Sequence, residues 1–365
     1  MRYMTNFLIT GYYGFLNSGD DAILTSMCEG IIRLGIPTKT TILSNNPMAT
    51  EEEYGVHATY RFNLLAVIKE IKNTDILLMG GGSLLQDRTS TRSLMYYLSI
   101  LWLAKLFKKK CMIYANGIGP IRRKMNRFFT KLMVNRVDII TLREHLSVKE
   151  LEKMGITKPL IKVTADPVFS LDLKAVSVKE ILEQENVDAS KPLVGVLFRD
   201  WKDKENYVIK MAKICDYVVE ELKMTILFIP MKYPTDIAIS NKIAEKMHCE
   251  SYTLRKNYDV NTIIGIIGET KFVLSMRLHA LLYAALKSVP MIGFIYDPKV
   301  KYFLKELKMY TIEDIEDFTF ESVKYHIDEI MNHYQEIQEN ILKEVTILTA
   351  KASENETYLK QLVQQ

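Results

Sequence analysis

Short apolar runs alternate with helical patterns along nearly the whole chain, and this alternation limits the possible folds more than any other feature. The runs are rich in β-branched and aromatic residues, and segments with helical spacing of their apolar residues lie between them. Strands that alternate with helices form βαβ units around parallel sheets. The sequence therefore predicts the α/β fold class.

A polar stretch at residues 175–191 separates two groups of predicted strands. The first group is expected at residues 6–10, 40–43, 75–79, 111–115, 138–142 and 160–164. The second is expected at residues 193–198, 225–229, 272–275 and 291–294. Since 365 residues exceed what one core usually serves, we expect two Rossmann-like domains facing a cleft. Their predicted bounds are residues 1–175 and 190–317, with C-terminal helices at 318–365 that pack back toward the first domain.

Several classes of protein are disfavoured by what the sequence lacks. No charged segment followed by a long apolar core opens the chain, and the longest apolar stretch, residues 94–107, is shorter than the roughly 20 residues of a membrane span. The four cysteines are scattered, and the histidines lack the spacing of metal ligands. We therefore expect a cytoplasmic protein with no transmembrane helix, no metal site and no nucleic-acid partner.

Charge is unevenly distributed along the chain. Residues 101–136 contain ten Lys or Arg and no Asp or Glu, beside the apolar Trp102, Leu106 and Phe107. Such a run is either an ordinary solvated surface or a surface that meets phosphates or anionic lipid. If the second interpretation holds, the protein associates weakly with the inner face of the cytoplasmic membrane.

Glycine-rich loops follow two predicted strands of the first domain. In parallel sheets ligands bind at the carboxyl ends of strands, and the loop GYYGFLNSGDD and the loop GGGSLLQD both begin there. Gly81 and Gly82 let the backbone approach a ligand before a helix whose amides attract anions. Asp20 either contacts a ligand or only caps the next helix. Candidates for acceptor binding or orientation in these loops are Gly14, Asn17, Asp20, Gln86 and Asp87.

Cationic side chains follow other predicted strands. Arg143 comes directly after one strand and Asp166 shortly after the next, while Arg199 repeats the placement of Arg143 in the second domain. An arginine at this edge is a candidate ligand for an anion. The segment SMRLHALLYAALKSVPMIGFIYDPKV is the densest cluster. Its candidates at two neighbouring strand ends are Arg277, His279, Tyr296, Asp297 and Lys299.

These segments together resemble the polysaccharide pyruvyltransferase family, and in particular the branch that acts on the secondary cell-wall polysaccharide anchoring S-layer proteins. The matching blocks also include YANGIGPI, TLREHLS and VTADPVF, so the resemblance spans most of the chain. It implies a GT-B-like fold with the active site between the domains. It further implies phosphoenolpyruvate as the donor substrate, a lipid-linked saccharide as the acceptor, and no cofactor.

Residue roles follow from this resemblance and from the chemistry of ketal formation. Phosphoenolpyruvate carries a carboxylate and a phosphate, for which Arg143, Arg199, Arg277 and Lys299 are expected ligands together with Gly81 and Gly82. His279 is the candidate acid/base, because an imidazole titrates near pH 6.5. Arg277 and Lys299 are expected to stabilise the departing phosphate.

Two other interpretations stay open. A nucleotide-sugar glycosyltransferase of envelope synthesis shares the expected architecture, with Glu306 or Glu313 as a possible ribose contact. A sugar-phosphate binding or scaffold protein is the non-enzymatic alternative.

Overall fold

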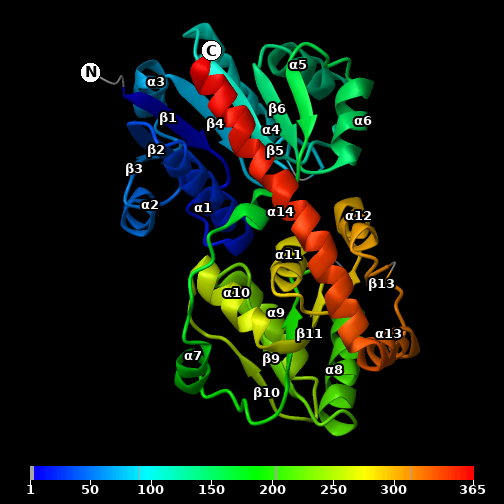
Figure 1. Ribbon diagram of the computed structural model, residues 1–365. Helices are drawn as coiled ribbons and strands as arrows, with labels where there is room; N and C mark the ends of the chain where they lie inside the picture. Colours follow the sequence, from blue (N-terminus) through cyan, green and yellow to red (C-terminus); the bar gives the residue numbers. More distant parts are fainter. Residues whose placement is uncertain (1–3, 89, 202–203, 313) are drawn as a thin grey trace. The chain divides into compact units, whose positions relative to one another are not determined.

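The computed structural model describes residues 4–88, 90–201, 204–312 and 314–365, and contacts divide the chain into two compact units (Figure 1). Unit 1 comprises the residues up to Asp172 together with Leu348–Gln365, and unit 2 comprises Leu173–Ile347. Each unit is built around one parallel sheet with helices beside it, so the predicted α/β class is confirmed.

Unit 1 contains a seven-stranded parallel sheet in the order β3-β2-β1-β4-β5-β6-β7. Its strands are β1 (Thr5–Thr10), β2 (Thr38–Ser44), β3 (His57–Tyr60), β4 (Ile76–Gly80), β5 (Lys110–Asn116), β6 (Ile139–Leu142) and β7 (Leu160–Val163). The order reverses between β1 and β4, where loops diverge and ligands bind in such sheets. The central strands β4 and β5 are almost wholly buried, which explains their continuous apolar sequences.

The helices of unit 1 connect these strands. They are α1 (Ser18–Arg33), α2 (Pro47–Tyr54), α3 (Leu64–Asn73), α4 (Thr91–Leu106), α5 (Lys124–Val134), α6 (His145–Lys153) and a 3-10 turn at Pro167–Ser170. The sequence specifies several starts directly, since the side chains of Asn46, Asn63 and Ser90 accept hydrogen bonds from the first turns of α2, α3 and α4. Helices α3 and α4 pack together, as do α4 and α5.

Unit 2 contains a six-stranded parallel sheet in the order β10-β9-β8-β11-β12-β13. Its strands are β8 (Leu193–Leu197), β9 (Thr225–Phe228), β10 (Ser251–Thr253), β11 (Thr270–Ser275), β12 (Met291–Phe294) and β13 (Tyr310–Ile312). Its helices are α7 (Val178–Gln184), α8 (Lys204–Glu220), α9 (Thr235–Ala244), α10 (Val260–Gly268), α11 (Leu278–Leu286), α12 (Pro298–Glu306) and α13 (Phe320–Asn332). The reversal of strand order lies between β8 and β11.

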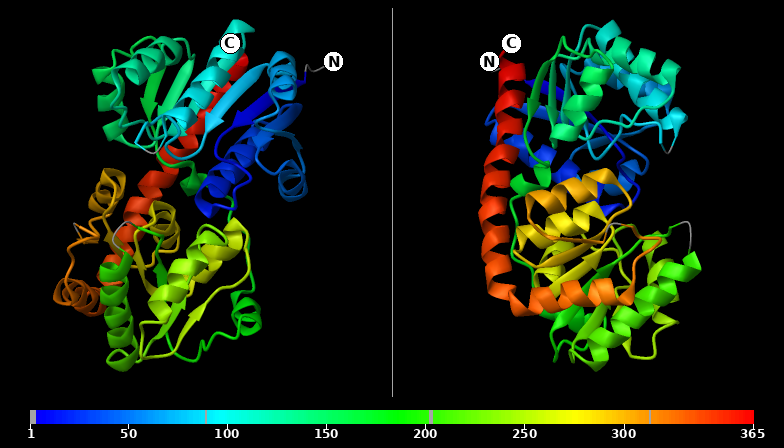
Figure 2. Two further views of the ribbon diagram at one scale, coloured as in Figure 1. Left: turned by 180° about the vertical axis from the view of Figure 1, so that it is seen from behind. Right: turned by 90° about the vertical axis from the view of Figure 1, so that its right-hand side faces the viewer.

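The last helix, α14 (Tyr334–Gln364), begins in unit 2 and continues into unit 1. Within unit 1, Glu356 pairs with Arg33 of α1 at 2.6 Å, and the Asn355 side chain accepts a 2.9 Å hydrogen bond from Thr164. Figure 2 shows this final part of α14, in red, on the opposite side of the unit 1 sheet from α4. The C-terminal residues from Leu348 are therefore an integral layer of unit 1.

The segment between the two predicted domains is also structured. Residues 178–184 form α7, and the carboxylate of Glu185 accepts hydrogen bonds from the backbone of Arg255 and Lys256. Contacts divide the chain at Asp172, so this segment belongs to unit 2.

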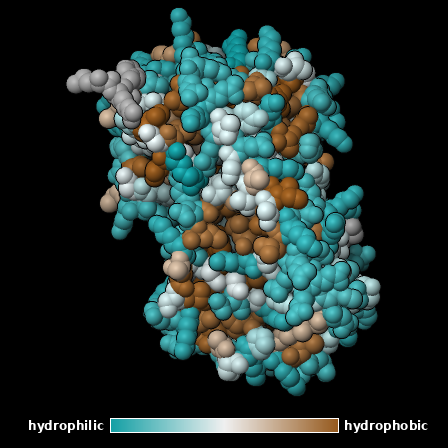
Figure 3. Space-filling model, viewed as in Figure 1, coloured by the Kyte–Doolittle hydropathy of each residue, from teal (hydrophilic) through white to brown (hydrophobic). Residues whose placement is uncertain are grey.

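All ten predicted strands are present. The three strands that the sequence did not reveal, β3, β10 and β13, are short and lie at sheet edges, where a strand needs fewer apolar residues. Hydrophilic residues predominate on the face of each unit drawn in Figure 3. Every helix within the described residues is too short or too polar to cross a membrane.

Candidate functional site

The glycine loops of unit 1 meet at the carboxyl ends of β1 and β4. Tyr13 is fully buried, and its hydroxyl donates a 2.7 Å hydrogen bond to the carbonyl of Gly80. Burial above all, with a contribution from Asp20, raises the pKa of this hydroxyl well above its usual range. Gly81 and Gly82 have φ of +107° and +42°, which L side chains rarely adopt. The loop conformation therefore requires glycine.

Asp20 lies beside this loop. The structure makes Asn17 the N-cap residue of α1 and places Asp20 within the first turn, so a cap role for Asp20 is wrong. A Cβ added to Gly82 would lie 3.2 Å from Asp20 Oδ1, and the Asn17 amide donates to the same carboxylate. Burial first, then the charges of Glu53 and Asp20, raise the pKa of the neighbouring Asp21 carboxyl. The structure thus gathers Asn17, Asp20, Gly81 and Gly82.

The other loop candidates of unit 1 have local partners. The Asp87 carboxylate accepts hydrogen bonds from the backbone of Arg122 and Arg123 and from Asn126, at 2.8 to 3.0 Å. Burial opposes ionisation of Asp87, but these bonds outweigh it and lower its pKa. Gln86 accepts from the Arg88 amide at 2.8 Å. Asp87 therefore fixes the start of α5.

Gly14 marks a sharp turn in the loop after β1. It has φ of +75°, and a Cβ there would lie 2.3 Å from Ser44 Oγ, so no larger residue fits. The backbone angle and the lack of space therefore explain why position 14 is a glycine.

Arg143, at the end of β6, forms ion pairs with two carboxylates. Its Nη1 lies 2.7 Å from Asp166 Oδ2 and its Nε lies 3.2 Å from Glu144 Oε2, and all three side chains are at most 6% exposed. The two predicted residues Arg143 and Asp166 therefore contact each other. Because two carboxylates already compensate the guanidinium, an anionic ligand would have to compete with them.

Arg61, which sequence reasoning missed, occupies the corresponding position after β3. It is 5% exposed and donates to the Gly11 carbonyl at 2.9 Å and to the Tyr97 hydroxyl at 3.2 Å. Its guanidinium lies 4.5 Å from the centre of the Tyr96 ring. Arg61 thus anchors the first glycine loop. The signal was the same as for Arg143, an arginine after a strand, but β3 itself was not predicted.

The candidate site of unit 2 centres on Arg277, directly after β11. Its guanidinium pairs with Asp236, whose side chain is 1% exposed and also accepts hydrogen bonds from the amides of Met231 and Lys232. The Arg277 amide donates to Ser275 Oγ, whose hydroxyl donates to the Leu197 carbonyl at the end of β8. The Nε atom of Arg277 is buried without a hydrogen-bond partner among the described residues. A buried guanidinium donor without a partner is uncommon, and it marks Arg277 as a candidate functional residue.

The other predicted residues of unit 2 lie along the same sheet edge. His279 is the second residue of α11 and Lys299 the second of α12, and these helices follow the adjacent strands β11 and β12. Arg199, after β8, lies 5.6 Å from the centre of the Tyr296 ring, which also contacts Trp201. Asp297 is the N-cap of α12 and accepts a 3.0 Å hydrogen bond from the Lys299 amide.

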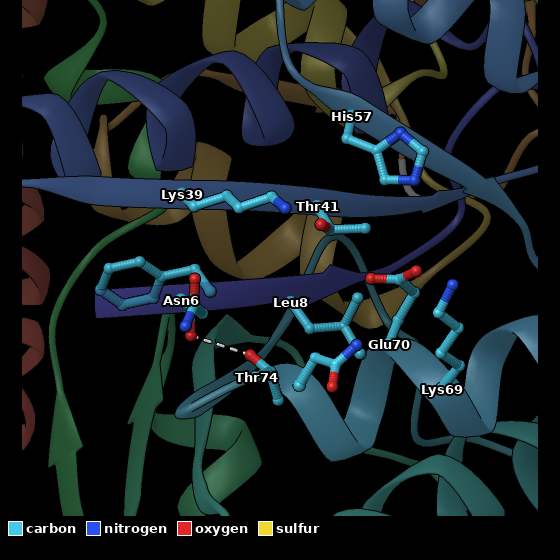
Figure 4. Close-up of a pocket in the computed structure, with 10 residues that line it drawn as sticks. Asn6, Leu8, Lys39, Thr41, His57, Lys69, Glu70 and Thr74 are labelled. Atoms are coloured by element: carbon cyan, nitrogen blue, oxygen red, sulfur yellow. Dashed lines mark hydrogen bonds between the residues drawn. The ribbon is translucent and has the colours of Figure 1, made fainter. Parts of the chain in front are cut away.

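A pocket of about 270 Å³ lies elsewhere in unit 1 (Figure 4). Figure 4 shows Asn6 and Leu8 of β1, Lys39 and Thr41 of β2, and side chains of α3 around it. These residues lie toward the amino ends of the strands, opposite the glycine loops. The pocket contains none of the predicted site residues.

Two further sequence interpretations concern metals and ribose. Within residues 4–88, 90–201, 204–312 and 314–365, no three His, Cys, Asp or Glu side chains are grouped as metal ligands. Glu306 is the last residue of α12, eight positions beyond its start and so roughly 12 Å from the carboxyl edge of the sheet. Glu313 lies outside the described residues.

Solved structures that are similar over nearly the whole chain define the class of fold. A glycosyltransferase from Rickettsia africae ESF-5 matches with a TM-score of 0.65, at 13% identity and 99% coverage of both chains. A putative UDP-N-acetylglucosamine 2-epimerase from Listeria monocytogenes matches with a TM-score of 0.67, at 12% identity, covering 96% of this chain and 94% of that one. The fold is therefore GT-B-like, as predicted.

The sequence comparisons identify the family within this class. Residues 17–298 match the family described as "Polysaccharide pyruvyl transferase". The chain is also 19% identical over 297 residues to "Amylovoran biosynthesis protein AmsJ" of Erwinia amylovora, covering 76% of this chain and 70% of that protein. The family match spans well over half of the chain. This protein belongs to the polysaccharide pyruvyl transferase family, which supports an enzyme that transfers pyruvyl groups to a polysaccharide.

Proposed function

We propose that this protein transfers the pyruvyl group of phosphoenolpyruvate to two hydroxyls of one sugar residue, forming a cyclic ketal and releasing phosphate. The observation that carries the proposal is Arg277, whose guanidinium is held by Asp236 while its buried Nε donor lacks a partner among the described residues. Arg277 and His279 both lie within the residues matched by the family. A held cation and, two positions along the chain, an imidazole are the residue types that protonation and departure of an anionic group require.

The proposed reaction has two additions of a hydroxyl to C2 of the donor, separated by the loss of phosphate. His279 protonates the methylene carbon of phosphoenolpyruvate, which makes C2 an oxocarbenium-like electrophile. The first sugar hydroxyl forms a bond to C2 and gives up its proton, which restores His279. The C2–O bond to phosphate then breaks, the second hydroxyl closes the ring, and its proton leaves with phosphate. Arg277 and Lys299 stabilise the charge on the departing group.

The donor carries two anionic groups, so further ligands are needed. We propose that Arg199 binds the second anionic group of the donor. Arg199 follows β8, and β8 pairs with β11, the strand that Arg277 follows. The amides of Gly81 and Gly82 are donor candidates in unit 1. Arg143 is a secondary candidate, since Glu144 and Asp166 already pair with it. All these charges come from side chains and backbone, so we propose that neither a metal nor a cofactor takes part.

Asp20 of unit 1 and Tyr296 of unit 2 are the proposed acceptor contacts. The Asp20 carboxylate beside Gly82 can accept a hydrogen bond from a sugar hydroxyl and orient it for attack. Tyr296 in unit 2 offers an aromatic face of the kind that contacts sugar rings. Because Asp87, Asp297 and Gly14 have local contacts, we propose structural roles for these three residues.

We propose a lipid-linked saccharide of the cell wall as the acceptor. The resemblance of the sequence blocks to the S-layer-anchoring branch supports the secondary cell-wall polysaccharide, with an N-acetylhexosamine as the modified sugar. Such an acceptor is made at the cytoplasmic membrane, so the enzyme is expected in the cytoplasm with weak attachment to the inner membrane face.

Product analysis tests the proposed function. Purified protein is incubated with phosphoenolpyruvate and candidate saccharides, lipid-linked and lipid-free. We expect the saccharide mass to rise by that of pyruvic acid less water, with one phosphate released per product. A parallel incubation with nucleotide sugars tests the glycosyltransferase alternative, for which the position of Glu306 gives no support. Glycosyl transfer without pyruvyl transfer contradicts the proposal.

A further inference from the structure

Helices α4 and α5 expose large apolar side chains on their outer faces. Trp102 and Leu106 of α4 are 46% and 57% exposed, and Met125, Phe128 and Leu132 of α5 are 63%, 58% and 40% exposed. The two helices pack against each other on one side of the unit 1 sheet. We call these five side chains the α4–α5 apolar surface.

The spacing of these residues shows that they form stripes. Met125, Phe128 and Leu132 stand at positions i, i+3 and i+7 of α5, and Trp102 and Leu106 stand at i and i+4 of α4. Other positions of both helices, such as Leu98 and Val134, are already buried in the core. The folding of unit 1 therefore does not account for the exposed stripes.

Exposed apolar residues are more frequent on helices α3, α4 and α5 than in unit 2. Of the eighteen large hydrophobic side chains exposed in the described residues, seven belong to α3, α4 and α5. The described part of unit 2 has four, Ile209, Tyr325, Leu342 and Ile347. Isolated exposed apolar residues are normal, but a cluster indicates an interaction surface.

The charges around the α4–α5 apolar surface indicate the kind of partner. Residues 101–136 contain ten Lys or Arg and no acidic residue. Lys105 pairs with Asp138, and Lys110 donates to the Leu362 carbonyl, so these two lysines serve the fold. Lys124 and Lys131 are exposed on α5 and make no ion pair among the described residues. Basic side chains beside exposed Trp, Phe and Leu are typical of helices that lie in the interface of an anionic membrane.

We propose that the α4–α5 apolar surface docks on a bilayer containing anionic phospholipid, with Trp102 and Phe128 entering the headgroup region and Lys124 and Lys131 contacting lipid phosphates. This proposal rests on the proposed function, because it assigns the membrane attachment of the enzyme to this surface. Binding to the membrane can nevertheless be tested without phosphoenolpyruvate or a sugar acceptor. The ten basic residues and no acidic residue of the segment 101–136 favour an anionic lipid surface as the partner. A second copy of this chain would bring equal positive charges together.

Vesicle co-sedimentation without substrates tests this proposal. The wild type should bind vesicles of phosphatidylcholine and phosphatidylglycerol but not of phosphatidylcholine alone, with part of the binding surviving added salt. The variant Met125→Ser/Phe128→Ser should bind at least about tenfold more weakly, because it loses two side chains of the α4–α5 apolar surface, Phe128 among them. Lys124→Glu/Lys131→Glu should lose the salt-sensitive part of the binding.

Unit 2 provides a matched control. Tyr325→Ser/Leu342→Ser removes two side chains of similar exposure, 60% and 58%, and should bind vesicles like the wild type. All three variants should retain wild-type activity on a short, lipid-free acceptor, which separates this proposal from the proposed function. Equal vesicle binding by the α5 serine variant and the wild type would overturn the proposal. The proposal would also be overturned if the wild type did not bind anionic vesicles, or if it formed dimers through Phe128.

Discussion

The carboxylate of Asp236 holds the guanidinium of Arg277 at the carboxyl edge of the unit 2 sheet. Asp236 is 1% exposed and Arg277 13%, and the same carboxylate accepts the amides of Met231 and Lys232. A buried charge-assisted pair of this kind fixes the direction of the remaining guanidinium donors. Asp236 is therefore a positioning residue that acts through Arg277.

Replacing Asp236 should impair donor binding. In Asp236→Asn the guanidinium loses its ionic partner and its orientation, so the affinity for phosphoenolpyruvate should fall about tenfold, measured by titration calorimetry. Asp216→Asn is the matched control, because Asp216 also accepts two backbone amides in unit 2 but pairs with no arginine in the described residues. Equal donor affinity in the two variants would remove Asp236 from the site.

Arg143→Ala should act mainly on stability. Its removal leaves the carboxylates of Glu144 and Asp166 buried without their cation, which costs about 3 to 5 kcal/mol in the free energy of unfolding. Urea denaturation measures this loss, with the exposed Arg136→Ala as the control. If Arg143→Ala unfolds like the wild type but no longer binds donor, Arg143 is a primary donor ligand instead.

Gly82→Ala should separate loop strain from activity. Its φ of +42° costs an L residue about 1 to 2 kcal/mol, and the new methyl would lie 3.2 Å from Asp20 Oδ1. Gly35→Ala has a similar strain at φ +66° but no atom within 4 Å of its Cβ. We expect both variants to lose stability and only Gly82→Ala to lose turnover, by about tenfold or more. Equal turnover in the two variants argues against a role for the Asp20 contact.

The sequence predicted the central strands and the residues that follow them, because continuous apolar runs and carboxyl-edge placement are local signals. Arg277, His279 and Lys299 were expected to follow strands on this basis, and in the structure they do follow β11 and β12. Asp236 was missed because it is the second residue of α9, at the end of MKYPTD, where an acidic residue looks like an ordinary helix start. Its contact with Arg277 spans 41 residues and arises only when β9 and β11 flank β8.

Pairing between predicted residues was equally hidden. Arg143 and Asp166 were both named, but as independent ligands, and their ion pair depends on the register of β6 against β7. Asp87 was expected near the acceptor, whereas its carboxylate is taken up by the start of α5, 35 residues further along. Sequence patterns thus show which residues lie at the carboxyl ends of the strands, but they do not show which of these residues contact each other.

His279→Gln should retain the fold and donor affinity while losing turnover. Glutamine can hydrogen-bond but cannot cycle a proton, so the rate should fall at least about a hundredfold. Initial rates at saturating phosphoenolpyruvate measure this loss, and a donor titration of the same variant is the control. Turnover near that of the wild type would leave His279 with a structural role.

The fate of the donor atoms tests the central claim of pyruvyl transfer most directly. The reaction is run in D2O with phosphoenolpyruvate labelled with ¹⁸O at the bridge between C2 and phosphorus, and both products are weighed. The account predicts one deuterium in the methyl group of the ketal and the ¹⁸O in the released phosphate, because the methylene carbon is protonated and the C2–O bond breaks. A product that keeps the ¹⁸O, or a sugar that gains phosphate, would contradict it.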